Sequence, residues 1–180
     1  MVYVHLAEGF EEIEALTIVD LLRRADIDTE MVSVTGHLPV TGAHGVKVVA
    51  DILFEDAVYN NCEMIVLPGG LPGAENLYAH EGLREKIFSF HNNGKLLAAI
   101  CAAPLVFGRN GLLEGKKATC YPGKEGELKG ALLTEGDVVS DGGIITSRGP
   151  ATAMAFALAL IEALKDKEAA GEIASGLLYT

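Results

Sequence analysis

The chain has 180 residues, of which 49% are hydrophobic and 22% are charged, and this composition is typical of a folded protein with a sizeable core. Its net charge of −11 disfavours electrostatic binding to nucleic acids and to anionic membranes. No apolar run approaches the roughly 20 residues that span a bilayer, and the first residues show neither a basic segment nor a cleavage site. We therefore expect a single acidic domain over residues 1–180, located in the cytoplasm.

Three cysteines and five histidines bear on metal and redox chemistry. The cysteines are odd in number and lack metal-ligand spacing, which favours free thiols in a reducing compartment. The histidines form no ligand cluster in the sequence, so each is interpreted as a surface or packing residue. We therefore expect no metal and no cofactor. The residues are Cys62, Cys101, Cys120, His5, His37, His44, His80 and His91.

Apolar runs with strand character alternate with amphipathic, helix-like segments along the chain. This alternation is typical of a mostly parallel sheet with helices on both faces. Turn-forming residues mark two hairpins, the second around Asp141-Gly142-Gly143. In chain order we expect strand 2–6, helix 11–24, strand 31–34, a small hairpin over 36–50, a short helix or loop over 51–61, strand 64–67, helix 83–93, strand 96–100, helix 104–110, a short strand at 118–122, an irregular segment over 123–136, a hairpin over 138–147, and helices 151–165 and 167–175.

Acidic residues crowd the first turn of the first predicted helix. Carboxylates are favourable there because the N-terminal end of a helix dipole is positive, and this explains Glu11 and Glu12 without a function. Glu14 differs because it neighbours Ile13 on the apolar side of the helix. Glu14 either stabilises the positive end of the helix dipole as well, or its side chain faces the carboxyl edge of the sheet.

Two loops that follow buried strands carry the chemically suggestive residues. Pro68-Gly69-Gly70 follows the strand at 64–67, and its glycines let bare N–H groups approach an anion. Cys101 follows the strand at 96–100, directly before Pro104 opens a helix. A sharp strand-to-helix turn of this kind projects a nucleophile, and the helix N-terminus favours a thiolate or an oxyanion.

Cys101 also has a simpler interpretation, because free cysteine is often a small buried hydrophobe. The carboxyl ends of parallel strands, however, meet at one edge of the sheet, where ligands gather. Glu14, the Gly69-Gly70 loop and Cys101 all belong to that edge. This convergence favours a reactive Cys101 facing an oxyanion-binding loop.

Four stretches in register resemble the ThiJ/PfpI family, and most closely its parkinsonism-associated protein deglycase branch. They are Gly9-Phe10-Glu11-Glu12-Ile13-Glu14, Val66-Leu67-Pro68-Gly69-Gly70, Ala98-Ala99-Ile100-Cys101-Ala102-Ala103-Pro104 and Thr146-Ser147-Arg148-Gly149-Pro150. The likeness covers nearly the whole chain.

The resemblance implies a flavodoxin-like three-layer sandwich and a homodimer. It further implies that Cys101 is the nucleophile and Glu14 its protonatable partner, with the anion pocket formed by backbone N–H groups at Gly69, Gly70 and Ala102. Arg148 matches a family arginine that helps to build an anion site near the dimer interface. A salt bridge at a helix start is the alternative role for Arg148.

Two departures from the family pattern concern histidine. Protease-like members carry histidine directly after the cysteine, where this chain has Ala102, so a Cys-His protease dyad is disfavoured. The close branch often has histidine where this chain has Tyr121. Cys120 is either a resolving thiol for an oxidised Cys101 or a spectator, and we place Tyr121, Cys120 and Arg148 among the candidate substrate-binding residues. Cys62 is interpreted as structural.

The resemblance therefore implies a glyoxalase or deglycase that acts on 2-oxoaldehydes, or on early glycation adducts of proteins, without cofactor or glutathione. Cys101 would add to the aldehyde and Glu14 would shuttle the proton. The alternative is an oxidative-stress sensor or redox-regulated chaperone, in which peroxide takes Cys101 to the sulfinate.

Overall fold

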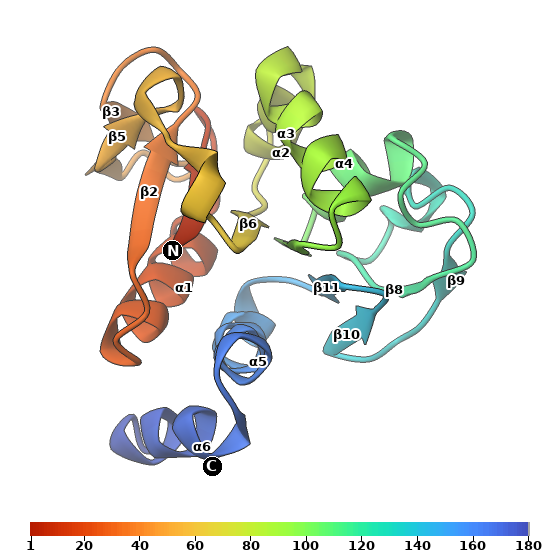
Figure 1. Cartoon of the computed structure of the whole chain (residues 1–180). Coiled ribbons are helices and arrows are strands. Elements are labelled where there is room, and N and C mark those ends of the chain that lie inside the picture. The colour runs from red at the N-terminus through yellow and green to blue at the C-terminus, as the bar shows by residue number, and fades with distance from the viewer. Residues whose placement is uncertain (180) are drawn as a thin grey trace.

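Seven strands form the central sheet of the computed structural model, which describes residues 1–179 (Figure 1). Their order is β10-β11-β7-β6-β1-β2-β5, and every neighbouring pair except β10–β11 is parallel. The strands are β1 (Val2–Leu6), β2 (Thr29–Ser33), β5 (Ile52–Leu53), β6 (Met64–Leu67), β7 (Leu96–Ile100), β10 (Val138–Asp141) and β11 (Ile144–Ser147).

Helices cover both faces of this sheet, with α2, α3 and α4 on one side and α1 and α5 on the other, and α6 packs outside α5 (Figure 1). The predicted α/β sandwich is therefore confirmed. Within residues 1–179, no helix has the length and apolar character needed to cross a bilayer. The helices are α1 (Glu12–Arg24), α2 (Gly73–Ala79), α3 (Glu81–Asn92), α4 (Pro104–Arg109), α5 (Ala153–Leu164) and α6 (Lys167–Gly176).

Two small two-stranded sheets lie outside the central one. The predicted first hairpin is confirmed as the antiparallel pair β3 (Pro39–Thr41) and β4 (Lys47–Val49). The segment 123–136, expected to be irregular, contributes β9 (Leu132–Leu133), which pairs with β8 (Lys117–Ala118). Each strand of this second pair has only two residues, too few for a periodic pattern to appear in the sequence.

Two further elements differ from the sequence-based expectation. Helix α2 starts directly after the glycine loop, in a segment where no helix is expected from the sequence. Its start lacks the polar N-cap side chain that usually signals a helix, because Pro72 precedes Gly73. The segment 51–61 contains β5 and two short 3₁₀ turns. Strand β5 extends the sheet by pairing with the last two residues of β2.

Continuous apolar strands explain why the sheet is buried on both faces. All five residues of β1 and all four of β6 are buried, because helices pack against both sides of these central strands. The three largest fully buried side chains are Phe10, Phe107 and Phe156, which come from the loop before α1, from α4 and from α5. The core therefore extends through both helical layers.

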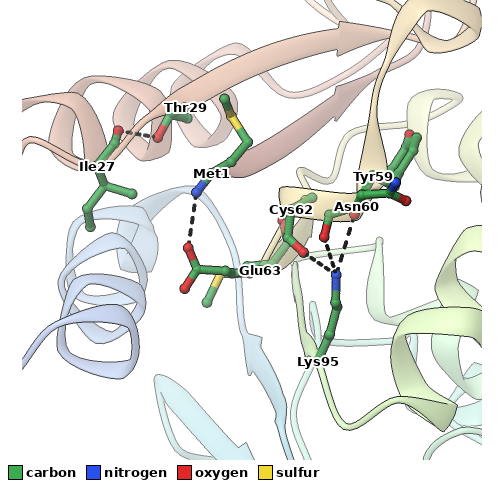
Figure 2. A network of polar contacts seen from close by, with 9 residues as sticks. Met1, Ile27, Thr29, Tyr59, Asn60, Cys62, Glu63 and Lys95 are labelled. Carbon is green, nitrogen blue, oxygen red and sulfur yellow. Dashed lines mark hydrogen bonds and ion pairs between the residues drawn. The ribbon is translucent and has the colours of Figure 1, made fainter.

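Polar contacts tie together the amino ends of the strands (Figure 2). The amino group of Met1 pairs with Glu63 at 3.1 Å, which links the starts of β1 and β6. Lys95, just before β7, donates from Nζ to the carbonyl oxygens of Cys62 at 2.7 Å, Asn60 at 3.3 Å and Tyr59 at 3.4 Å. These contacts fix the edge of the sheet opposite to the glycine loop.

One buried histidine sits on the central strand. His5 is fully buried, its Nε2 lies 2.8 Å from the Tyr59 hydroxyl, and its Nδ1 has no protein partner among residues 1–179. Burial, together with the nearby charge of His80, lowers the pKa of His5 to about 3. The packing role expected for His5 fits this neutral, aromatic-lined position.

His5 makes the folded state sensitive to acid. The unfolded chain protonates this imidazole below pH 6.5 and the folded chain only near pH 3, so stability falls as pH decreases through that window. We expect His5→Gln to shrink the loss of unfolding free energy between pH 7.5 and pH 4.5 by about 2–3 kcal/mol. Urea unfolding at both pH values measures this, with His37→Gln as the exposed control. An undiminished loss in His5→Gln would contradict the assignment.

Candidate active site

Cys101 occupies a sharp turn between β7 and α4. Its φ is +64°, a left-handed conformation that is unusual for a residue with a side chain. The backbone is fixed on both sides, because Cys101 N–H donates to Ser147 O at 2.9 Å and Cys101 O accepts from Tyr121 N–H at 2.8 Å. The side chain is 8% exposed. The predicted elbow is therefore present, and neighbouring strands hold its strained conformation.

Glu14 lies beside Cys101 inside the protein. Its side chain is fully buried, and Oε2 accepts a hydrogen bond from Gly69 N–H at 2.7 Å. A Cβ atom built at Gly69 would lie 2.6 Å from Cys101 Cβ and 2.8 Å from Glu14 Oε2. The two functional side chains thus converge on Gly69. Of the two orientations considered for Glu14, the structure has the one that faces the sheet edge.

Burial controls the protonation of Glu14. Loss of solvent raises the pKa of its carboxyl to about 7, opposed by the Gly69 N–H and by contact with the Cys101 thiol. The charge of Glu11 acts in the same direction as burial. Glu14 Oε1 meets no hydrogen-bond donor in good geometry within residues 1–179. Near neutral pH both the protonated and the ionised form of this carboxyl are therefore accessible, and one of its oxygens is free to accept a proton.

The sequence predicted that the helix terminus and nearby N–H groups would acidify Cys101, and the structure shows the opposite direction. Burial, reinforced by the neighbouring Glu14, raises the pKa of the thiol to about 12. The N–H groups of Gly70 and Ala102 lower the pKa but do not outweigh burial. Cys101 therefore rests as a thiol, and it needs a base to become a nucleophile.

The three predicted anion-pocket residues have different roles in this geometry. Gly70 and Ala102 direct their N–H groups at the Cys101 thiol. The N–H of Gly69 is already bonded to Glu14, so it orients the carboxyl instead. Gly70 has a φ of +87°, and a Cβ there would lie 2.5 Å from Glu11 N, so only glycine fits.

A cavity of about 650 Å³ contains Cys101, and its walls come from six segments that are separated in the sequence. From the sequence we expect His44 to be a surface or packing residue and Glu11 to stabilise the helix dipole. In the structure both residues line this cavity. Only the folded hairpin turn between β3 and β4 brings His44 there, and no sequence motif marks it. Among the lining residues are Glu11, His44, Gly70, Ala102, Tyr121 and Lys124.

Glu11, Glu12 and His44 form a polar cluster at the start of α1. Glu12 Oε2 lies 2.8 Å from His44 Nδ1, and its Oε1 accepts from the backbone N–H groups of His44 and Val46 at 2.8 and 3.3 Å. Glu12 therefore fastens the hairpin turn to α1, beyond the dipole role expected from sequence. Within residues 1–179 this is the one group of three potential metal-ligating side chains with ligand atoms within 4.8 Å of one another.

The other candidate residues divide between two places. Tyr121 lines the Cys101 cavity and is half exposed. Cys120 and Arg148 instead line a neighbouring cavity of about 300 Å³, together with Glu125 and Thr119. The structure therefore brings Tyr121 to the candidate active site, whereas Cys120 and Arg148 lie beside it. Cys62 is fully buried, and its Sγ donates to Met64 O at 3.2 Å, in keeping with a structural role.

Comparison with known proteins shows relatives that match nearly the whole chain. The sequence profile of the DJ-1/PfpI family matches residues 1–163. Protein DJ-1 homolog B of Arabidopsis thaliana is 44% identical over 179 residues, which are 98% of this chain and 41% of that protein. Protein dj-1beta of Drosophila melanogaster is 37% identical over 97% of this chain and 95% of its own length. The chain thus spans less than half of the Arabidopsis relative.

Solved structures show the same fold. The structure of oxidised Toxoplasma gondii DJ-1 superposes with a TM-score of 0.95 and 41% sequence identity. The alignment covers 99% of this chain and 98% of that one. The similarity therefore extends through both helical layers and the sheet.

Gly69 offers a direct test of how tightly the two side chains are packed. We expect Gly69→Ala to reduce the free energy of unfolding by about 1–3 kcal/mol, because the new methyl group displaces Cys101 and Glu14. Gly126→Ala is the matched control, since a Cβ there has no neighbour within 4 Å. Urea unfolding measures both, and equal effects in the two variants would contradict the close approach.

The raised pKa of Glu14 predicts how stability depends on pH. The folded state favours the protonated carboxyl, so its contribution is complete below pH 4.5 and is lost as pH rises through 7. Glu14→Gln, which stays neutral, should exceed the wild type in unfolding free energy by about 1–3 kcal/mol at pH 8.5.

The advantage of Glu14→Gln should vanish near pH 4.5, where the wild-type carboxyl is protonated. Denaturant titration across pH 4.5–8.5 measures this, and the exposed Glu162→Gln serves as control. A Glu14→Gln protein that is less stable than the wild type at pH 8.5 would show that the buried carboxylate is stabilising.

Proposed function

This chain belongs to the DJ-1/PfpI family, and we propose that it is a cysteine-dependent glyoxalase that converts 2-oxoaldehydes to 2-hydroxy acids. Methylglyoxal and glyoxal are the simplest substrates, and the same chemistry would reverse early glycation adducts on proteins. The observation that carries the proposal is the pairing of Cys101 with the buried Glu14 at a cavity of about 650 Å³.

The first step makes the nucleophile. Ionised Glu14 takes the proton of the Cys101 thiol, and its free Oε1 supports this role as a base. The sulfur then forms a bond to the aldehyde carbon, whose oxygen becomes an oxyanion. The N–H groups of Gly70 and Ala102, which face the sulfur, stabilise that charge. Glu14 then gives the thiol proton to the oxyanion, which forms the hemithioacetal and leaves Glu14 ionised again.

The second step is an internal redox reaction. Glu14 removes the proton from carbon one and returns it to carbon two, and the hydroxyl proton on carbon one passes to the oxygen on carbon two. Carbon one thereby becomes a thioester carbonyl and carbon two carries a hydroxyl. Carbon one is oxidised by two electrons and carbon two is reduced by two, so no external oxidant or reductant takes part. Water then hydrolyses the thioester and releases the 2-hydroxy acid and the Cys101 thiol. Methylglyoxal gives lactate.

Redox sensing through Cys101 is the second candidate. Its support is the same N–H pair, which would hold sulfinate oxygens, together with the Toxoplasma gondii relative, whose solved structure is of the oxidised protein. Peroxide, however, reacts with the thiolate, and burial keeps Cys101 protonated. The aldehyde reaction overcomes this obstacle because Glu14 removes the proton within the site. We therefore place aldehyde chemistry first.

We also propose a homodimer that uses the face next to the cavity. Four apolar side chains on α1 and the β3–β4 hairpin are exposed. Exposed apolar side chains that gather on neighbouring elements are typical of a protein interface. The residues are Ile13, Leu16, Val46 and Val49.

Lactate formation from methylglyoxal without glutathione tests the proposed function. We expect turnover by the wild type, none by Cys101→Ser, and a loss of about 10²- to 10⁴-fold in Glu14→Gln, because the proton shuttle is removed. The kcat/KM of the wild type should rise as pH increases through about 7, where Glu14 ionises.

Cys62→Ala is the control, since Cys62 is buried away from the cavity and should leave turnover unchanged. Normal turnover in Glu14→Gln would refute the proton-shuttle role. If the wild type forms no lactate while peroxide adds two oxygen atoms to Cys101 by mass, redox sensing replaces glyoxalase chemistry.

A further inference from the structure

His44 is the one histidine among residues 1–179 that lines the Cys101 cavity. It lies in the turn between β3 and β4, and its side chain is 71% exposed. The cavity is larger than a three-carbon aldehyde requires, and at about 650 Å³ it falls in the range of sites that hold larger ligands. A substrate with a further polar group would therefore reach the cavity wall.

Two carboxylates hold the imidazole from one side. His44 Nδ1 lies 2.8 Å from Glu12 Oε2 and 3.5 Å from Glu11 Oε2. The backbone N–H of His44 also donates to Glu12 Oε1, at 2.8 Å. Nε2, on the far side of the ring, has no partner among residues 1–179. Both carboxylates favour the imidazolium form, in which Nε2–H is a free charged donor.

Charged groups from two other segments determine what this donor can attract. Glu11 lines the cavity from the start of α1, and Lys124 lines it from the loop after β8. Glu12 contacts His44 from the same helix, and Glu14 lies deeper, beside Cys101. When His44 is protonated, its charge offsets one of the two carboxylates that contact it, and Lys124 is a second cation on the cavity wall.

We propose that His44 is a specificity-determining residue that selects 2-oxoaldehydes carrying a carboxylate, and that it binds this carboxylate through Nε2–H. The inference rests on the proposed function and names its substrate class. A suitable substrate is 4,5-dioxopentanoate, whose aldehyde and carboxylate stand at opposite ends of a five-carbon chain. The same internal redox reaction, followed by addition of water, converts it to 2-hydroxyglutarate.

The arrangement also explains why the chain carries Glu12 and His44 as a pair. The hydrogen bonds from Glu12 hold the hairpin turn against α1 and direct the ring, while leaving the second nitrogen free. Burial raises the pKa of the Glu12 carboxyl, but its hydrogen bonds with His44 and with backbone N–H groups outweigh this and lower it. The bond with Glu12 correspondingly raises the pKa of His44.

Alkylation of Cys101 tests the charge effect without any turnover. Iodoacetate is an anion and iodoacetamide is neutral, and both react with the thiolate, so the ratio of their rates cancels the thiolate fraction. His44→Gln keeps an N–H donor for Glu12 and removes the titratable charge. His37→Gln is the matched control, because His37 is exposed and lies outside the cavity. Peptide mass identifies the alkylated cysteine.

At pH 6, we expect the ratio of the iodoacetate rate to the iodoacetamide rate to be about threefold higher in the wild type than in His44→Gln. The reason is the attraction between one positive charge on His44 and the iodoacetate anion across the cavity. As pH rises and His44 loses its proton, the two ratios should converge. Glu14 titrates in both proteins, so only their difference reports on His44. His37→Gln should match the wild type. Equal ratios in wild type and His44→Gln at pH 6 would overturn the proposal.

Turnover then tests the substrate class. We expect the kcat/KM for 4,5-dioxopentanoate, divided by that for methylglyoxal, to fall about threefold in His44→Gln at pH 6.5 and to stay unchanged in His37→Gln. An unchanged quotient in His44→Gln would reject the carboxylate selection while leaving the glyoxalase in place. If the wild type turns over neither aldehyde, the proposed function fails, and the alkylation ratio still decides whether His44 attracts anions.

Discussion

The burial of Glu14 against Cys101 is the constraint on which the candidate site depends. A carboxyl and a thiol in one dry pocket do not ionise together readily, so the pair favours states in which one of them keeps the proton. This coupling turns two weak acids into a proton-transfer unit. Gly69 makes the contact possible, because it has no side chain and its N–H fixes one oxygen of the carboxyl.

The amino ends and the carboxyl ends of the strands carry different kinds of contacts. At the amino ends of the strands, an ion pair joins Met1 to Glu63, and Lys95 donates a hydrogen bond to the carbonyl oxygen of Cys62. At the carboxyl ends, the chain carries a left-handed cysteine and a glycine loop with bare N–H groups. Strain of this kind persists only where the surrounding structure enforces it, and the bonds of Cys101 to Ser147 and Tyr121 supply that support.

The small β3–β4 hairpin contributes more than its size suggests. Glu12 draws the turn against the start of α1, and this places His44 at the cavity that also contains Cys101. One glutamate is thereby used for architecture, while its neighbours Glu11 and Glu14 face the cavity and the thiol. Glu11 and Glu12 both contact His44, whereas Glu14 turns inward to Cys101, because residues two apart on a helix point in different directions.

The sequence by itself determined the α/β architecture, the elbow at Cys101 and the candidacy of Glu14, because apolar periodicity, glycine and proline positions are local signals. It could not show β5 and β9, whose two-residue strands carry no period, or the direction of the pKa of Cys101, which depends on how much water the folded chain excludes. Only the tertiary structure brought His44 into the cavity and separated Cys120 and Arg148 from it. Those placements depend on contacts between segments far apart in the chain, and no local pattern encodes them.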